Sequence, residues 1–226
     1  KVKIEEKLQI KDSWTFKDES IAAHFDHHVR EQLPWYDLVS DAVADLAKHF
    51  IYDGALIYDI GASTGNMARR LSGMLKDRKA SIACIENSEE MFSKMQFKER
   101  FISAVRDDAR THTYKEFDLG ILFLTLMFIP VQDRYALVDK LLERLKVGGA
   151  VIIVDKMVAP KGYLSTCFFR LMLQAKARAG ADLGDTAFKE TSLAGIQRPL
   201  ESNELDKYIR KHIKSYSNRE YEAEEF

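Results

Sequence analysis

The stretch IYDIGASTGNMARRL, residues 57–71, decides the fold. An apolar run reaches Asp59, Gly61 and Gly65 follow, and a helical pattern begins immediately afterwards. A strand, a glycine turn and a helix in this order predict the first unit of an open α/β sheet, in which ligands bind beyond the carboxyl ends of the strands. Because glycine lets the backbone turn tightly and approach another group closely, we expect a ligand at this turn.

The composition limits the classes of function. A chain of 226 residues with 46% hydrophobic residues is sufficient for one well-packed domain. Its 34 Lys and Arg residues balance 35 Asp and Glu residues, so no overall field attracts a polyanion such as tRNA. Cys84 and Cys167 lie in apolar surroundings far apart in sequence, which predicts buried thiols in a reducing compartment. No apolar run approaches the roughly 20 residues of a membrane span, so we expect a cytoplasmic protein without membrane contact.

The order of segments predicts a Rossmann-like, doubly wound, mainly parallel sheet. Short apolar runs alternate with helical segments or loops, as expected for strands covered on both faces. We expect one domain over residues 1–226, with N-terminal helices in residues 1–50 and a lid in residues 161–200 after the fifth strand. Within the lid we expect a helix followed by a loop over residues 181–195. The expected strands cover residues 55–60, 81–86, 101–105, 119–126 and 150–156.

The residues at the expected strand ends indicate the class of ligand. The spacing Gly-Ala-Ser-Thr-Gly differs from the GxGxxG of dinucleotide sites, and the preceding Asp59 favours a cation over a pyrophosphate. A sulfonium ligand with an amino group fits this better. Glu86 ends the second strand, where a carboxylate accepts both hydroxyls of a ribose. After the third strand, Asp108 is placed to accept from an adenine amino group, and Ala109 leaves room for the ring.

Ordinary structural explanations compete with each of these assignments. Glu86 alone would fit a solvated acid at a helix N-terminus, and Asp108 a loop cap. The HFDHH stretch, residues 24–28, could place two histidines one helical turn apart around a metal, but a solvated helix face explains it better, and we expect no metal. Some basic and aromatic residues of the lid helix could contact tRNA, although an amphipathic surface explains them better: Arg170, Lys176, Arg178, Phe168 and Phe169.

Several ordered motifs resemble class I S-adenosylmethionine (SAM) dependent methyltransferases, and among them the carboxy-S-adenosylmethionine synthase family. They are WTFKDESIAAHFDHHV and LPWYDLV near the N-terminus, IYDIGASTG, IACIENSEEM, and the segment from LTLMFIPVQDRY to AVIIVDK. The resemblance runs from about Trp14 to Leu205. It implies SAM, or S-adenosylhomocysteine, as the bound nucleoside, with carboxy-SAM less expected. The implied cofactor-binding residues, together with Asp59 and Gly65 from the motif itself, are Tyr36, Gly61, Ala62, Ser63, Glu86, Asn87, Asp108 and Ala109.

Two departures from that family bear on the reaction. Phe123 stands where the family has an asparagine near the ligand, and Lys189 and Glu190 stand where it has Lys-Arg. In the family the arginine pairs with a carboxylate on the SAM methyl carbon, and a glutamate there would repel it. We therefore expect an acidic pocket and a methyltransferase with an unidentified acceptor and no assigned catalytic residue. The alternatives are a prephenate-dependent carboxy-SAM synthase of the tRNA wobble-uridine pathway and a non-catalytic SAM-binding protein.

The C-terminus leaves the sheet short of its usual final pair of strands. After the helical pattern NELDKYIRKHI, only KSYSNREYEAEEF follows, which is enough for one strand. Either the chain is truncated or the last strand is missing, and a missing strand would leave an unpaired sheet edge with which a second subunit could pair. We therefore expect a homodimer as one outcome for this chain and a truncated C-terminus as the other.

Overall fold

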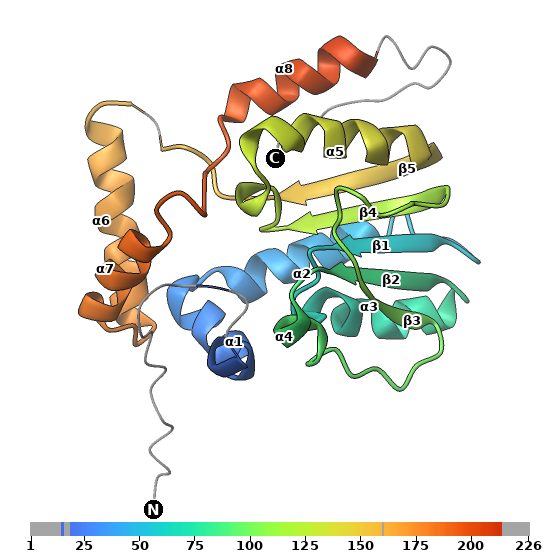
Figure 1. Ribbon diagram of the computed structural model, residues 1–226, viewed down its shortest axis with the longest axis horizontal. Coiled ribbons are helices and arrows are strands. Elements are labelled where there is room, and N and C mark those ends of the chain that lie inside the picture. Colours follow the sequence, from blue (N-terminus) through green and yellow to red (C-terminus); the bar gives the residue numbers. More distant parts are fainter. Residues whose placement is uncertain (1–14, 16–18, 160, 214–226) are drawn as a thin grey trace, which may run out of the picture.

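Five parallel strands form one sheet in the order β3-β2-β1-β4-β5 (Figure 1). The structure is a computed structural model that describes residue 15, residues 19–159 and residues 161–213. The predicted doubly wound α/β fold is confirmed, and the strand order reverses direction at β1, between β2 and β4. The strands are β1 (Leu56–Ile60), β2 (Ser81–Glu86), β3 (Ile102–Arg106), β4 (Phe117–Phe123) and β5 (Leu145–Val154).

Helices cover both faces of the sheet and continue past its carboxyl edge. In Figure 1 the arrowheads of β4 and β5 point toward the side where α6 and α7 stand. The helices are α1 (Glu19–Gln32), α2 (Tyr36–Ala47), α3 (Asn66–Asp77), α4 (Glu89–Phe92), α5 (Val131–Arg144), α6 (Tyr163–Arg178), α7 (Leu183–Ser192) and α8 (Ser202–Ile213), with a 3₁₀ turn η1 (Leu126–Phe128).

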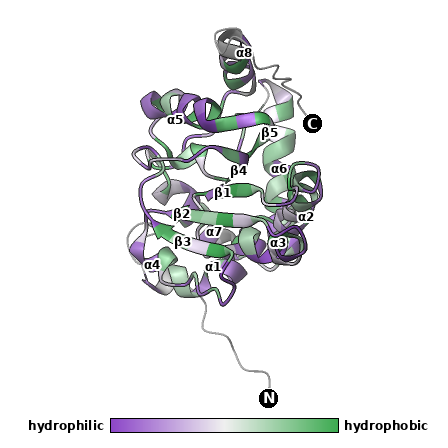
Figure 2. Cartoon of the chain, turned by 90° about the vertical axis from the view of Figure 1, so that its right-hand side faces the viewer, coloured by the Kyte–Doolittle hydropathy of each residue, from purple (hydrophilic) through white to green (hydrophobic). Residues whose placement is uncertain are grey.

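The hydrophobic core has two main parts, one on each face of the sheet. On one face, side chains of α2 and α3 such as Ala47 and Leu71 pack against Ile57 and Ile121 of the strands. On the other face, α5 and part of α8 pack against β1 and β4. Because both faces are covered, the central strands are continuously apolar, and Figure 2 colours much of them hydrophobic. This arrangement leaves the carboxyl ends of the strands as the place for a ligand.

The lid differs from its prediction. Residues 181–195 were expected to form a loop, but α7 occupies Leu183–Ser192. Asp182 caps this helix, because its Oδ1 accepts hydrogen bonds from the backbone N–H groups of Gly184 and Asp185 at 2.8 and 3.0 Å. An aspartate N-cap was the available sequence signal, and Gly184 obscured it. A second correction concerns Cys167, which is exposed on α6, whereas Cys84 is buried in β2 as predicted.

The sheet edge on the β5 side bears on the expected homodimer. Up to Ile213, the described residues add no sixth strand beside β5. The C-terminal stretch on which the expectation depends, residues 214–226, lies outside the described residues, so the homodimer stays a prediction. No helix in the described ranges has both the length and the apolar character to cross a membrane.

Candidate functional site

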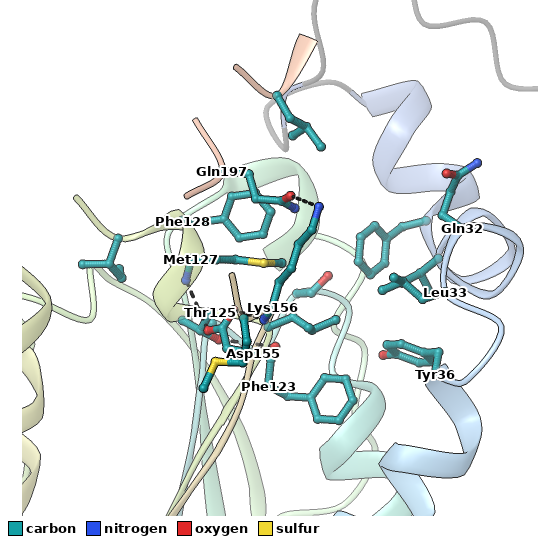
Figure 3. A pocket seen from close by; sticks show the side chains of 18 of the residues that line it. Gln32, Leu33, Tyr36, Phe123, Thr125, Met127, Phe128, Asp155, Lys156 and Gln197 are labelled. Atoms are coloured by element: carbon teal, nitrogen blue, oxygen red, sulfur yellow. Dashed lines mark hydrogen bonds between the residues drawn. The ribbon is translucent and has the colours of Figure 1, made fainter. Parts of the chain in front are cut away.

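A cavity of about 750 Å³ lies at the carboxyl ends of the strands, between the sheet, α1 and the lid helices α6 and α7. This volume falls in the range of small-molecule sites. Figure 3 shows Lys156 extending along the cavity toward Gln197, with Gln32, Leu33 and Tyr36 on another wall. All the predicted cofactor-binding residues except Gly65 line it: Tyr36, Asp59, Gly61, Ala62, Ser63, Glu86, Asn87, Asp108 and Ala109.

Neighbouring side chains, as well as the cavity, leave little room at the glycine turn after β1. Gly61 has φ +74°, and a Cβ there would lie 2.6 Å from Cγ2 of Thr125. Gly65 has φ +84° at the N-cap of α3, and a Cβ there would lie 2.4 Å from the ring of Phe97. Gly65 does not line the cavity, and its glycine is required by the turn and by Phe97, so its assignment as a cofactor-binding residue stays a prediction. Ser63, between them, also has a positive φ of 53°.

Glu86 fixes this turn at the end of β2. Its Oε2 accepts a hydrogen bond from the backbone N–H of Ser63 at 2.8 Å, and its Oε1 accepts one from Ser88 N–H, also at 2.8 Å. Burial raises the pKa of Glu86, and the backbone hydrogen bonds of Ser88, Ser63 and Asn87 oppose that rise. Each carboxylate oxygen keeps a further acceptor position, so the side chain can hold the turn and still accept from a ligand.

Asp59 is a buried carboxylate that lacks a compensating cation. The residue is 2% exposed, and its Oδ2 has no hydrogen-bond partner in the part of the chain that the structure describes. Burial, followed by the charge of Glu86, raises the pKa of Asp59 to about 7. A buried acceptor that lines a cavity beside a second acid favours a cationic or hydrogen-bond-donating ligand.

The loop after β3 contributes two acids and a small residue. Asp108 pairs with Arg110, with Nη2 and Oδ2 2.7 Å apart, and this hydrogen bond lowers the pKa of Asp108. The Asp108 carboxylate is thus already paired with a cation. An adenine amino group could bind it only alongside Arg110. The preceding Asp107 also lines the cavity and was not predicted; its Oδ2 lies 2.8 Å from Nδ1 of His112. Ala109 is buried there, as a site for a ring requires.

Two aromatic rings form the cavity wall next to the glycine turn. The rings of Tyr36 and Phe123 meet edge to face, with centroids 5.4 Å apart. Asn66 Nδ2 donates to the hydroxyl of Tyr36 at 3.3 Å. Phe123 thus provides packing where the related family has an amide, and Tyr36 links α2 to the start of α3.

The HFDHH stretch of α1 makes contacts that the sequence did not reveal. Asp26 Oδ1 accepts from Thr64 Oγ1 and Asn66 Nδ2, each at 2.7 Å, so α1 is tied to the glycine turn. His27 pairs with Glu31, and His28 contacts Lys189 of the lid. Within the described ranges, no three His, Cys, Asp or Glu side chains form a group able to hold a metal. The structure gives this stretch a role in connecting α1 to both walls of the cavity.

Lysines surround Glu190 in the lid. Glu190 Oε1 lies 3.1 Å from Lys176 Nζ, and Oε2 lies 3.5 Å from Lys156 Nζ. Lys189 is the third lysine on this wall. The aligned Lys-Glu pair did not reveal the cations that α6 and the segment after β5 bring to the lid side of the pocket. The expected net acidity next to the sulfonium stays a prediction, since Asp59 and Glu86 line the same cavity. Acidic strand ends face a basic lid.

The proposed tRNA-contacting residues do not share one face. Lys176 is buried and lines the cavity, whereas Phe168, Phe169, Arg170 and Arg178 are exposed. Phe168 and Phe169 also contribute to the cavity lining. Another residue that sequence reasoning missed is Asp155, just after β5, whose pKa burial raises to about 6 and which accepts from Met127 N–H at 3.2 Å.

Comparison with known proteins agrees with this architecture. Residues 57–149 match the family described as a methyltransferase domain. The chain is 28% identical over 189 residues to a carboxy-S-adenosyl-L-methionine synthase of Staphylococcus epidermidis, covering 83% of this chain and 82% of the relative. It is 24% identical over 188 residues to a protein of the same name from Shewanella baltica, covering 80% of this chain and 77% of the relative.

Solved methyltransferase structures share the fold. A chain in the complex between the Haloferax volcanii Trm112 methyltransferase activator and a methyltransferase superposes with a TM-score of 0.57 at 14% identity, covering 90% of this chain and 76% of that chain. DhpI in complex with SAM and HEP superposes with a TM-score of 0.51 at 19% identity, and the alignment spans 63% of each chain. At sequence identities this low the superpositions show the fold alone. They confirm the predicted class I methyltransferase architecture.

Proposed function

We propose that this chain, whose residues 57–149 form a SAM-dependent methyltransferase domain, holds SAM against the strand ends and transfers its methyl group to a small acceptor under the lid. The observation that carries the proposal is the buried Oδ2 of Asp59, which has no hydrogen-bond partner among the described residues and belongs to a side chain that lines the same cavity as Glu86 and the glycine turn. A cationic nucleoside would satisfy this group. SAM combines a sulfonium and an ammonium with an adenosine, so it suits both acids.

The strand ends support one orientation of SAM. Glu86 would accept from the two ribose hydroxyls, with the adenine toward Asp108 and Ala109. The methionine part would then lie along the glycine turn, where Asp59 lies near the end of β1 and Gly61 follows the strand. Tyr36 and Phe123 would present aromatic rings to the sulfonium, an arrangement that favours a cation. Methyl transfer chiefly requires alignment and removal of water, which a covered cavity provides.

A second candidate, carboxy-SAM synthesis, is supported by the lid lysines. Because Lys176 and Lys156 pair with Glu190, the glutamate no longer argues against a carboxylate at this wall. The similarity to two proteins named carboxy-SAM synthases points the same way. The departure from the family's Lys-Arg pair still favours plain methyl transfer, since no arginine fork aligns there.

Mass spectrometry of the nucleoside tests both candidates. Purified protein would be incubated with SAM alone, with SAM and prephenate, and with SAM and the small-molecule filtrate of a cell extract. Methyl transfer predicts S-adenosylhomocysteine with the filtrate and no carboxy-SAM with prephenate. Carboxy-SAM formed from prephenate would establish the second candidate. Tight binding of SAM without turnover in any mixture would instead identify a non-catalytic SAM-binding protein.

A further inference from the structure

Helices α1 and α7 meet through two side-chain pairs at the lid end of the cavity. Lys189 Nζ lies 3.0 Å from His28 Nε2, and Gln32 Nε2 lies 3.5 Å from Thr186 Oγ1. His28 and Gln32 are one turn apart on α1, and Thr186 and Lys189 are one turn apart on α7, so each helix presents one face to the other. Gln32, Thr186 and Lys189 all line the cavity. An amine and an amide therefore share one end of it.

Charged groups from several elements surround Lys189. Lys176 of α6 and Lys156 after β5 oppose its positive charge, while Glu190 beside it on α7 favours that charge. Burial is the largest influence, and together these groups lower the pKa of Lys189 to about 7. Burial and the charges of Lys189, His27 and Lys176 lower the pKa of His28 to about 3, so its ring stays neutral where Nε2 shares a hydrogen bond with Lys189 Nζ.

Gln32 supplies a matching hydrogen-bond acceptor. The side chain is 4% exposed, and its Oε1 has no partner among the residues described. A buried, unsatisfied carbonyl oxygen costs free energy unless a ligand donates to it. The nearest suitable donor would be an N–H or O–H of a molecule in the cavity, beside Lys189.

We propose that Lys189 is a catalytic base for the transfer and that the acceptor is a hydroxyl or an amine whose reacting O–H or N–H faces Lys189, while a second N–H or O–H of the same molecule donates to Gln32. This inference rests on the proposed methyl transfer. The acceptor lone pair attacks the methyl carbon, the carbon–sulfur bond breaks, and its electron pair returns to sulfur to give neutral S-adenosylhomocysteine. The proton of the acceptor O–H or N–H moves to the neutral Nζ, which becomes an ammonium and then loses the proton to solvent.

A base whose pKa lies near the working pH transfers protons most efficiently, and such catalysis contributes about 10²–10⁴-fold to a rate. If Lys189 instead served only to bind an anion, it would act through its positive charge. Arginine keeps that charge but does not give up its proton near neutral pH. Replacing Lys189 by arginine therefore separates a base from an anion-binding group.

The first experiment measures the protonation of Lys189 without an acceptor. The protein would be saturated with S-adenosylhomocysteine and labelled briefly with acetic anhydride across a pH series, and acetylation of each lysine would be quantified by peptide mass spectrometry. We expect labelling of Lys189 to rise with a midpoint near pH 7, well below the roughly 10.4 of an unperturbed lysine side chain. A midpoint near that unperturbed value for Lys189 would overturn the inference.

The second experiment measures S-adenosylhomocysteine release with the cell-extract filtrate. Lys189→Met and Lys189→Arg should both lower the rate by at least about 100-fold, with SAM affinity within about twofold of wild type, while Lys161→Met leaves the rate unchanged. Methylamine added to Lys189→Ala should restore part of the rate. A wild-type rate in Lys189→Arg or Lys189→Met would contradict the base. Wild-type protein that binds SAM but releases no product would contradict the proposed function instead.

Discussion

The two walls of the cavity are built in different ways. At the strand ends, backbone N–H groups hold the glycine turn in place, as in the hydrogen bonds from Ser63 and Ser88 to Glu86. At the lid, long side chains from different elements meet instead, as in the contacts of Glu190 with Lys176 and Lys156. The first wall is strict in its geometry. The second depends on how α1, α6 and α7 pack, and its side chains are long and partly exposed.

The two walls therefore differ in how well they tolerate amino-acid substitutions. A substitution in the glycine turn must disturb the backbone, because positive φ and close neighbours leave it no room. A substitution in the lid changes charge at flexible side chains, for which water compensates in part. We therefore expect substitutions in the glycine turn to change stability or SAM affinity more than substitutions in the lid.

Gly61→Ala should cause the largest loss of stability. The substitution places a Cβ 2.6 Å from Thr125 at a φ of +74°, so it combines a left-handed backbone with an overpacked contact. We expect a loss of about 3 kcal/mol in the free energy of unfolding, measured by urea denaturation. Gly54→Ala is the matched control, since Gly54 has φ +77° and nothing within 4 Å of the added Cβ. Equal losses in the two variants would show that the contact with Thr125 contributes nothing.

Glu86→Gln should weaken SAM binding by about 2 kcal/mol, or roughly thirtyfold, because charge-assisted hydrogen bonds to the ribose are lost. Calorimetric titration gives the dissociation constant. Glu89→Gln, on α4 and outside the cavity lining, serves as the control and should bind SAM as wild type does. An unchanged dissociation constant for Glu86→Gln would leave Glu86 as a structural acceptor of the turn alone.

Asp59→Asn should stabilise the ligand-free protein at pH 8. The folded pKa of Asp59, about 7, lies above its ordinary 3.8, so the folded state retains a proton that the unfolded chain has lost. Stability is therefore lost as the pH rises from about 4 to about 7, and the asparagine escapes this loss. We expect a gain on the order of 2 kcal/mol at pH 8 that vanishes near pH 4.

Urea denaturation at both pH values checks this, with the exposed Asp53→Asn as control. SAM should also bind Asp59→Asn more weakly at pH 8, since the cation loses its carboxylate. A variant less stable than wild type at pH 8 would argue that Asp59 is stabilised by a partner other than a bound ligand.

Glu190→Gln should have the smallest effect. The Glu190 side chain is 45% exposed, and its pair with Lys156 lies at the surface although Lys176 is buried, so we expect a loss of only about 1 kcal/mol in the free energy of unfolding and no change in SAM affinity. Denaturation and calorimetry measure the two quantities, with Glu143→Gln of α5 as an exposed control. A loss as large as that of Gly61→Ala would remove the contrast between the two walls.

Local pattern was enough to predict the sheet, because β1, β2 and the glycine turn are read from consecutive residues. The expected strands at 55–60 and 81–86 correspond closely to Leu56–Ile60 and Ser81–Glu86. Helix α7 was missed because Gly184 weakens the helical pattern after the Asp182 cap. The assignment of cofactor contacts to Tyr36 and Glu86 stays a prediction, although both side chains line the cavity.

The sequence by itself determined the fold class and the acids at the strand ends, since strand period and turn chemistry act between near neighbours in the chain. Only the tertiary structure decided the electrostatics of the lid. The contact between Lys189 and His28 joins residues 161 positions apart, and Lys176 reaches Glu190 from another helix. Charge at a site is the sum over all elements packed around it, and burial sets how strongly each charge acts. The aligned pair Lys189 and Glu190 was therefore not enough to predict the charge of the lid.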